Sequence, residues 1–372
     1  MVINKHPPLL FPIFKIKNHK NMKAVKKYSD NGVYFKMVED TIPEIEKDTD
    51  VKIQIEAIGI CTSDIHVLHG TMTMPDGNTV GHEYTGTVVE VGSAVRNVVP
   101  GDRVVCENAK DACFKCKLCL SGHYELCPHK RSPGWFSQGV YTEYTVQPEY
   151  CVHKIPMNMS KEVAAVAEPF AICVYGCLER GRFQKDDFTV IYGMGPIGLF
   201  TLITLVDLGA KNIVCVASTR KNKIRYQLSK DLGAKAVLLT EDDIPAKVKE
   251  MNDGWGADCV IDCSGDPNAI NEGIGLLRKG GKFIALGISH DTLIPFAFNQ
   301  AVLNVIEMVF SATSSHDAWI KVIGILERNE AKIKKVITHQ YALDDWELAY
   351  EKIANREAVK AVLLNSRNSQ DD

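Results

Sequence analysis

Four cysteines lie close together in one short segment of the chain. The intervals between them are two, two and seven residues, and the four are Cys113, Cys116, Cys119 and Cys127. Sulfurs at this spacing can converge from one loop on a single ion, and four thiolates at about 2.3 Å form a closed structural zinc site with no position for a substrate. The first intervals also match a bacterial iron–sulfur motif, although its last interval is much shorter. We predict zinc, with an iron–sulfur cluster and a disulfide as alternatives.

A second group of possible ligands has a different character. Cys61 opens the segment CTSDIH, and His82 and Glu83 lie in GHEYTGTVVEVG. One cysteine and one histidine far apart in sequence are more commonly buried core residues. Here an adjacent carboxylate and a glycine-bounded turn suggest a mixed sulfur, nitrogen and oxygen ligand set with one open position, which is the requirement for catalytic zinc. A closed site and an open site in one chain indicate a metalloenzyme.

The segment IYGMGPIGLF contains the pattern GxGxxG. An apolar run, TVIYG, precedes it and a helix-like run, LFTLITLVDLGA, follows it, which is the strand–turn–helix context of a dinucleotide site. Glycines let the backbone approach a pyrophosphate, and the N-terminus of the helix attracts its charge. The predicted contacts in this turn are Gly193, Gly195, Pro196, Ile197 and Gly198.

The next predicted strand, in VCVASTRKNK, bears on the choice of nucleotide. NAD enzymes place an Asp or Glu at its end to bind the ribose hydroxyls. This chain has Ala217 there, followed by hydroxyl and basic residues that can bind a 2′-phosphate. We predict NADP, with NAD as the alternative, and the predicted contacts are Ser218, Thr219, Arg220, Lys221 and Lys223.

The composition is that of an ordinary globular protein. With 372 residues the chain has room for two domains, and its formal net charge of −3 favours neither a nucleic acid nor an anionic membrane as a partner. No uninterrupted apolar run approaches the roughly 20 residues that span a bilayer. Residues 1–21 form an extension whose three prolines argue against a secretory signal, so we expect a cytoplasmic protein.

The sequence pattern changes along the chain. Residues 22–175 contain short β-like runs separated by Gly and Pro, as in a partly open β-barrel. Residues 176–312 alternate apolar strands with helical segments, which predicts an α/β domain with a doubly wound parallel sheet. Residues 313–372 contain two amphipathic helical segments, WIKVIGILER and WELAYEKIA, and a final strand, VKAVLL.

Together these motifs resemble the zinc-containing medium-chain alcohol and polyol dehydrogenases. GHE, the cysteine loop, GMGPIG, ADCVIDCSG and GGKFIALG occur in the order found in that family. The similarity is greatest to sorbitol and L-iditol dehydrogenases, because AVAEPFA has Glu168 before Pro169 where simple alcohol dehydrogenases have a cysteine ligand. The resemblance implies a GroES-like barrel to which residues 313–372 return, an inserted Rossmann domain, and a homo-oligomer, either a dimer or a tetramer.

The resemblance also implies roles for single residues. It places Glu83 and Glu168 at the catalytic metal without deciding which of them binds zinc, and it makes Ser63 and His66 a proton relay. It adds Leu286 and Gly287, from GGKFIALG, to the cofactor site. The expected cofactors are therefore two zinc ions per chain, one catalytic and one structural, together with NADP.

A carboxylate in place of a thiolate makes a more polar pocket, which suits a polyol or sugar derivative. The expected reaction is hydride transfer between a secondary hydroxyl and NADP, with a ketose as the product or, in reverse, the substrate. The segment VLHGTM and the short loop before His82 depart from many sorbitol dehydrogenases, so the particular polyol stays open. A general secondary-alcohol or diol dehydrogenase and an NADPH-binding regulatory protein are the alternatives.

Overall fold

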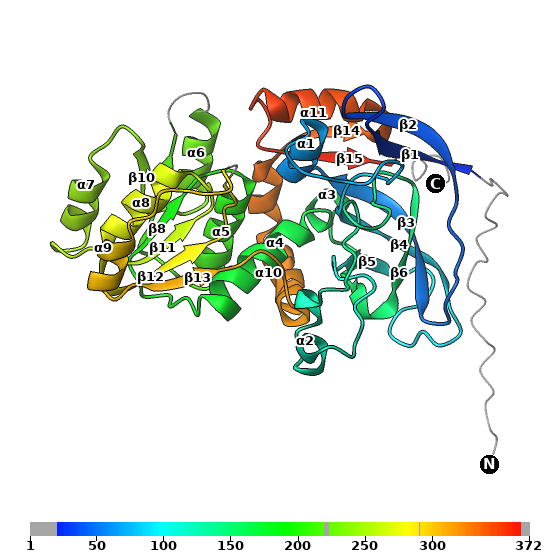
Figure 1. Ribbon diagram of the computed structural model, residues 1–372, viewed down its shortest axis with the longest axis horizontal. Helices are drawn as coiled ribbons and strands as arrows, with labels where there is room; N and C mark the ends of the chain where they lie inside the picture. Colours follow the sequence, from blue (N-terminus) through cyan, green and yellow to red (C-terminus); the bar gives the residue numbers. More distant parts are fainter. Residues whose placement is uncertain (1–20, 219–222, 290, 366–372) are drawn as a thin grey trace, which may run out of the picture.

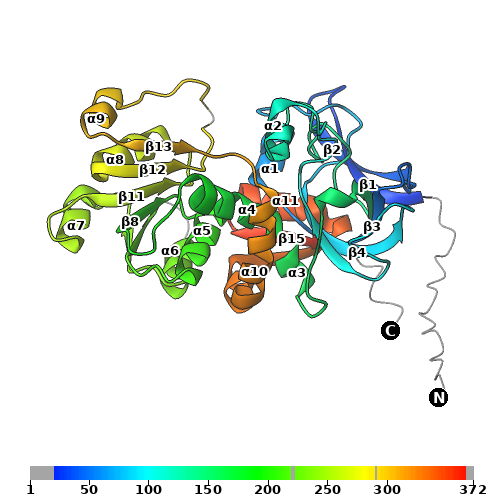
Figure 2. The ribbon, with the colours of Figure 1, turned by 90° about the horizontal axis from the view of Figure 1, so that it is seen from below.

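The protein has two lobes that lie side by side (Figure 1). The computed structural model describes residues 21–218, 223–289 and 291–365. Helices α4 (Ala167–Val174) and α10 (His316–Val336) lie between the lobes, as Figure 2 shows from a second direction. Three predicted cofactor residues, Thr219, Arg220 and Lys221, fall outside the described ranges.

The first lobe is built on a seven-stranded sheet with the order β14-β15-β3-β4-β5-β7, in which β6 also pairs with β3. These strands are β3 (Asp50–Gly59), β4 (Glu83–Val91), β5 (Arg103–Cys106), β6 (Tyr144–Pro148), β7 (Val152–Lys154), β14 (Ile337–Ala342) and β15 (Lys360–Leu364). The final strand β15 runs antiparallel to β3, with Leu363 opposite Ile58. The C-terminal segment therefore completes the lobe that the N-terminal half begins.

Short elements surround this sheet. An antiparallel ribbon of β1 (Asn21–Tyr28) and β2 (Tyr34–Thr41) lies at its side. The helices of the lobe are α1 (Thr62–Leu68), α2 (Lys117–Leu120), α3 (Lys161–Ala164) and α11 (Trp346–Ala354). Single turns of 3₁₀ helix occupy Tyr124–Leu126, Glu149–Cys151 and Leu343–Asp345, and a π-helical segment, Tyr175–Arg180, extends α4.

The second lobe contains a six-stranded sheet with the order β10-β9-β8-β11-β12-β13, in which every pairing is parallel. Its strands are β8 (Thr189–Tyr192), β9 (Ile213–Ala217), β10 (Ala236–Leu239), β11 (Ala257–Asp262), β12 (Leu277–Ala285) and β13 (Glu307–Phe310). Its helices are α5 (Pro196–Asp207), α6 (Lys223–Asp231), α7 (Ile244–Met251), α8 (Pro267–Leu276) and α9 (Phe298–Leu303). The strand order reverses at β8, with β9 and β10 on one side of it and β11, β12 and β13 on the other, which is the doubly wound arrangement. The predicted α/β architecture is therefore confirmed.

Alternating residues on each parallel strand build separate cores on the two faces of this sheet. Ile191 of β8 belongs to a core that includes Phe170 of α4 and Leu199 of α5. Its neighbour Val190 belongs to another core, which includes Val248 of α7 and Ile274 of α8. Because successive strand residues point to opposite faces, apolar residues at both positions let helices cover both sides.

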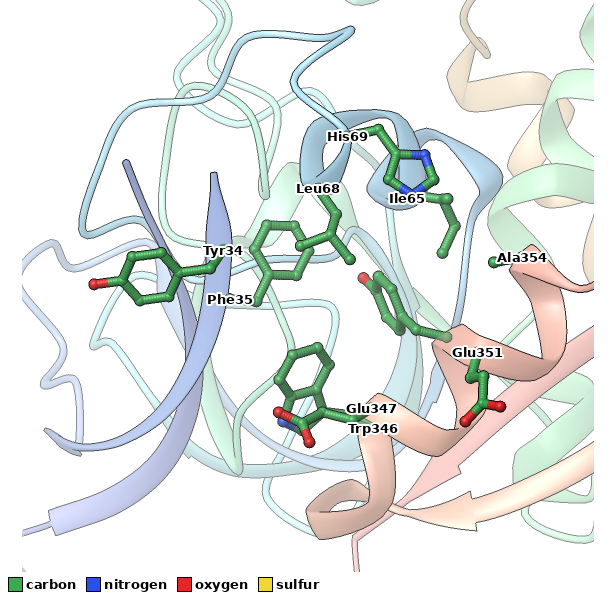
Figure 3. Close-up of a pocket in the computed structure, with 10 residues that line it drawn as sticks. Tyr34, Phe35, Ile65, Leu68, His69, Trp346, Glu347, Glu351 and Ala354 are labelled. Atoms are coloured by element: carbon green, nitrogen blue, oxygen red, sulfur yellow. The ribbon is translucent and has the colours of Figure 1, made fainter. Parts of the chain in front are cut away.

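A mainly apolar pocket lies between α1, α11 and the start of β2 (Figure 3). Its lining includes Phe35, Ile65, Leu68, Trp346 and Tyr350, with the carboxylates of Glu347 and Glu351 on α11. No predicted zinc or cofactor residue contributes to this lining. None of the helices in the described ranges combines the length and apolar character needed to cross a membrane.

Candidate active site and zinc centres

The four loop cysteines meet at one point. Cys113 Sγ lies 3.9 Å from Cys119 Sγ and 3.5 Å from Cys127 Sγ, and Cys116 Sγ lies 4.0 Å from Cys127 Sγ. Bonds of about 2.3 Å from sulfur to a tetrahedral ion require sulfur separations of about 3.8 Å. The four side chains therefore fit one zinc ion and form the closed structural site.

The same distances exclude the alternatives for this loop. Cysteine sulfurs in a disulfide lie about 2.05 Å apart, and all four of these thiols are free. Sulfurs this close leave no space between them for a cluster of several iron atoms. At Cys113 the backbone also favours the thiolate, because N–H groups, chiefly that of Lys115, lower the pKa of this thiol to about 6.

The second group of ligands assembles from two elements of the barrel lobe. Cys61 immediately precedes α1, while His82 and Glu83 lie where the chain enters β4. One ligand atom from each of these three residues lies within 4.8 Å of the other two. This is the Cys/His/Glu catalytic zinc site that the sequence predicts.

Neighbouring groups hold His82 in place. The adjacent Gly81 has φ +88°, and a Cβ there would lie 2.1 Å from the ring of Tyr141, so this turn requires glycine. Tyr141 donates a hydrogen bond to Asp64 Oδ2, and Asp64 Oδ1 lies 3.6 Å from His82 Nδ1. That nitrogen is buried without a hydrogen-bond partner among the described residues. An unsatisfied imidazole nitrogen beside a buried carboxylate is typical of a metal ligand.

Glu83 has a partner that sequence analysis did not identify. Lys360 Nζ lies 2.8 and 2.6 Å from its two carboxylate oxygens, and both side chains are buried. The space is tight as well, because a Cβ on Gly59 would lie 2.2 Å from Glu83 Oε2. The ammonium group therefore neutralises Glu83 and fixes its orientation beside the metal ligands.

Glu168 lies near the N-terminus of α4, outside the tight three-residue group. Its Oε1 accepts a hydrogen bond from Asn108 Nδ2 at 3.0 Å. Burial, together with the nearby charge of Glu83, raises the pKa of Glu168 to about 7. Glu168 accepts fewer hydrogen bonds from described residues than Glu83 does. Its negative charge is one of the influences that raise the pKa of His82.

Ser63 and His66, the predicted relay, are three residues apart on α1 and therefore lie on the same side of the helix. Ser63 Oγ is buried without a hydrogen-bond partner in the described part of the chain. Thr71 Oγ1 lies 3.4 Å from His66 Nδ1 and donates to the His66 carbonyl oxygen. The Ser63 hydroxyl, two residues after Cys61, is therefore left with unused hydrogen-bonding capacity.

The glycine turn follows β8 at the centre of the parallel sheet. Gly193 has φ +87°, and a Cβ there would lie 2.8 Å from Ser264, in the loop after β11. A Cβ on Gly198 would lie 2.1 Å from the Gly193 carbonyl oxygen. Gly195 caps α5, and Pro196 occupies its first turn ahead of Ile197. The turn therefore lies where the strand order reverses, which is the usual position for a dinucleotide.

The structure places the other predicted cofactor residues near the ends of the same parallel strands. Ser218 follows β9, Lys223 begins α6, and Leu286 and Gly287 follow β12. A Cβ on Gly287 would lie 2.2 Å from the Gly265 nitrogen, so these loops pack closely. The strand β9 ends at Ala217, which leaves no carboxylate at the position where NAD enzymes have one.

Arg225 of α6 is a further residue beside the glycine turn. Its Nη1 would lie 3.9 Å from a Cβ on Gly195, and its Nε is buried without a hydrogen-bond partner among the described residues. Sequence analysis missed Arg225, Lys360 and Asn108. The one available signal was a lysine opening the apolar strand KAVLL, because a buried lysine needs an anionic partner.

Comparison with known proteins agrees with this geometry. A family model described as the alcohol dehydrogenase GroES-like domain matches residues 47–157, and one described as zinc-binding dehydrogenase matches residues 196–328. The chain is 32% identical to a sorbitol dehydrogenase of Halalkalibacterium halodurans over 343 residues, which cover 92% of this chain and 99% of that protein. It is 33% identical to a D-arabitol-phosphate dehydrogenase of Enterococcus avium, over 92% of this chain and 97% of that one.

A solved structure is similar over the same extent. A zinc-binding dehydrogenase from Sinorhizobium meliloti, determined with NADP bound, superposes with a TM-score of 0.84 at 26% identity. The similarity covers 93% of this chain and all of that one.

Proposed function

The chain belongs to the zinc-containing medium-chain alcohol and polyol dehydrogenase family, and we propose that it transfers hydride between a secondary hydroxyl of a polyol or sugar derivative and NADP. The family makes it a zinc-dependent, NAD(P)-dependent dehydrogenase. The proposed substrate class rests on one observation: the Glu168 carboxylate, hydrogen-bonded to Asn108, lies beside the Cys/His/Glu group.

The chemistry that zinc supplies when held by Cys61, His82 and a carboxylate is Lewis acidity, which acidifies a substrate hydroxyl or polarises a ketone. The protein must then move a proton out of the site. We assign Ser63 Oγ as a relay that accepts the hydroxyl proton while it releases its own, and His66, on the same side of α1, as the group that passes a proton towards solvent. A bound nicotinamide cofactor would supply the hydride acceptor.

We propose separate roles for the two carboxylates. Lys360 donates hydrogen bonds to both carboxylate oxygens of Glu83. Glu83 is therefore fixed in position beside Cys61 and His82, and its negative charge is neutralised. Glu168 accepts one hydrogen bond, from the Asn108 amide. Its remaining lone pairs can bind zinc or accept a hydrogen bond from a second substrate hydroxyl. A substrate with adjacent hydroxyl groups makes use of such an acceptor, whereas a simple alcohol does not.

NADP is the nucleotide that we propose. Its support is the neutral end of β9, the adjacent hydroxyl of Ser218, and the basic residues that follow, of which Arg220 and Lys221 lie outside the described ranges. The similar structure from Sinorhizobium meliloti contains NADP. The roles of the individual site residues and the domain bounds near 175 and 312 are part of the same proposal.

We also propose a cytoplasmic homo-oligomer. All twelve cysteines are free thiols, as in proteins of reducing compartments. Among the described strands β13 pairs only with β12, and Phe310 on this edge strand is 66% exposed while the nearby Val305 is 75% exposed. An open strand edge with apolar neighbours favours pairing with a second copy, in a dimer or in a tetramer built from dimers.

A substrate panel tests the proposal. Zinc-loaded enzyme is assayed with sugar alcohols, sugar-alcohol phosphates, vicinal diols and simple secondary alcohols, each with NADP and with NAD, and Cys61→Ser is the inactive control. We expect oxidation of at least one polyol or polyol phosphate, with NADP preferred. Activity confined to simple alcohols would support the runner-up, a general secondary-alcohol dehydrogenase.

A further inference from the structure

A third group of potential metal ligands lies away from both zinc sites. Glu107, His153 and His316 each place one ligand atom within 4.8 Å of the others. Glu107 directly follows β5, His153 lies in β7, and His316 is the first residue of α10. The group therefore joins two barrel strands to the long helix between the lobes. None of the chemistry proposed above uses it.

The centre of this group is a buried carboxylate. Glu107 is 1% exposed, and its Oε1 lies 2.7 Å from His153 Nε2 and 2.8 Å from His316 Nδ1. Tyr124 donates its hydroxyl proton to the same carboxylate, at 2.9 and 2.8 Å from the two oxygens. Among the described residues, Glu107 has two ion-pair partners, and both are histidines. A buried carboxylate needs a positive charge, which either a protonated imidazole or a bound cation can supply.

The two histidines differ in their exposure. His153 is buried, and its ring stacks on Trp319 with a centroid distance of 5.8 Å and an interplanar angle of 6°. The His316 side chain is 47% exposed. The group thus has a buried inner side and one side open to solvent. An ion can enter from that side, and water can complete its coordination.

We propose that Glu107, His153 and His316 form a third, non-catalytic site for a divalent transition metal such as Zn²⁺, Co²⁺ or Ni²⁺. Two imidazoles and a carboxylate are a donor set that these ions accept. Metal–ligand distances of about 2.0–2.2 Å put neighbouring donor atoms about 3.0–3.4 Å apart, so the imidazole nitrogens must move outward by roughly half an ångström. His316 can do this because it lies at the exposed start of a helix. The bound ion clamps α10 to β5 and β7.

Metal binding by His316→Gln tests the site. Glutamine keeps a donor for Glu107 but is a poor ligand for these ions, so the variant separates hydrogen bonding from coordination. Protein with both zinc sites filled is titrated with Co²⁺, and bound metal is counted by calorimetry and by elemental analysis after desalting. We expect one further equivalent in the wild type, with affinity lower by ~10-fold or more in His316→Gln. The matched control, His339→Gln, should bind like the wild type.

Tryptophan fluorescence locates the ion. Co²⁺ bound to His153 should quench the stacked Trp319, so Trp319→Phe should lose the quenching. Trp135, whose ring centroid is 6.0 Å from that of His82, reports instead on the catalytic site, and Trp135→Phe should retain the quenching. Equal Co²⁺ binding by the wild type and His316→Gln, no third equivalent, or quenching that disappears only in Trp135→Phe would each overturn the proposal.

Discussion

Lys360 donates hydrogen bonds to both carboxylate oxygens of Glu83, although 277 residues separate them in the chain. The same ammonium group donates to the Ile60 carbonyl oxygen at 2.8 Å, next to the predicted zinc ligand Cys61. The final strand, β15, therefore sets the charge balance of a site whose ligands come from the N-terminal half. Replacing this one lysine should disturb both stability and metal binding.

Lys360→Met should lower the free energy of unfolding by about 3–5 kcal/mol in the zinc-free protein, because it leaves the Glu83 carboxylate buried without a partner. Lys360→Met combined with Glu83→Gln should recover most of that loss, since both charges are then absent. Urea unfolding of the single and double variants measures the difference. Lys334→Met removes partly exposed ion pairs with Glu330 and Glu162 and serves as the control, with an expected loss below about 1 kcal/mol. Equal losses for the three variants would show that the buried pair has no special role.

In protein prepared without excess metal, Cys113→Ser should reduce the tightly bound zinc from two ions to one and lower thermal stability, while the remaining folded enzyme keeps its KM. The reason is that four thiolates close the structural site and leave no position for a substrate. Elemental analysis and thermal unfolding of the same preparation check this. Loss of turnover in a variant that retains both zinc ions and full stability would contradict a purely structural role.

His82→Ala should abolish turnover and leave NADPH binding nearly unchanged, because the metal ligands and the glycine turn belong to different lobes. Fluorescence titration with NADPH measures binding independently of activity. Ser121→Ala, at an exposed hydroxyl outside the active site, is a control for general effects of substitution. Turnover above a few per cent of the wild-type value in zinc-depleted His82→Ala would mean that the metal is not needed for the reaction.

The local motifs were predictable because each comes from one short segment. The four cysteines lie within a single loop, and Gly193 and Gly198 have the spacing that a tight turn requires whatever surrounds it. Alternating apolar strands and helices also predicted the doubly wound sheet, which covers both faces of strands such as β8.

The partners of those motifs were not predictable in the same way. Lys360 reaches Glu83 only because β15 pairs with β3, and Asn108 reaches Glu168 across a tertiary contact between a loop and a helix. His316 and Glu107 are 209 residues apart and meet because α10 packs on the barrel lobe. Such contacts depend on the assembled fold, and a single sequence carries no periodic signal for them.

Arg220→Ala should weaken the binding of NADP by about ten- to a hundredfold and the binding of NAD very little, because the guanidinium is expected to bind only the 2′-phosphate. Arg225→Met should weaken both nucleotides, since Arg225 lies beside Gly195 in the turn that approaches the shared pyrophosphate. Dissociation constants for both cofactors, measured for both variants, separate the two roles. A parallel loss of NADP and NAD in Arg220→Ala, or tighter wild-type binding of NAD, would reject the NADP assignment.

The most direct test of the proposed substrate class is the ratio of kcat/KM for two substrates that differ by one hydroxyl group. Each polyol or vicinal diol is compared with the secondary alcohol that lacks the neighbouring hydroxyl, under identical zinc and NADP concentrations. The proposal that Glu168 accepts this second hydroxyl predicts a ratio of ~10³ or more in favour of the polyol, because a site built for that hydrogen bond loses it with the simple alcohol. A ratio near or below one for every pair would contradict the assignment to polyols or sugar derivatives.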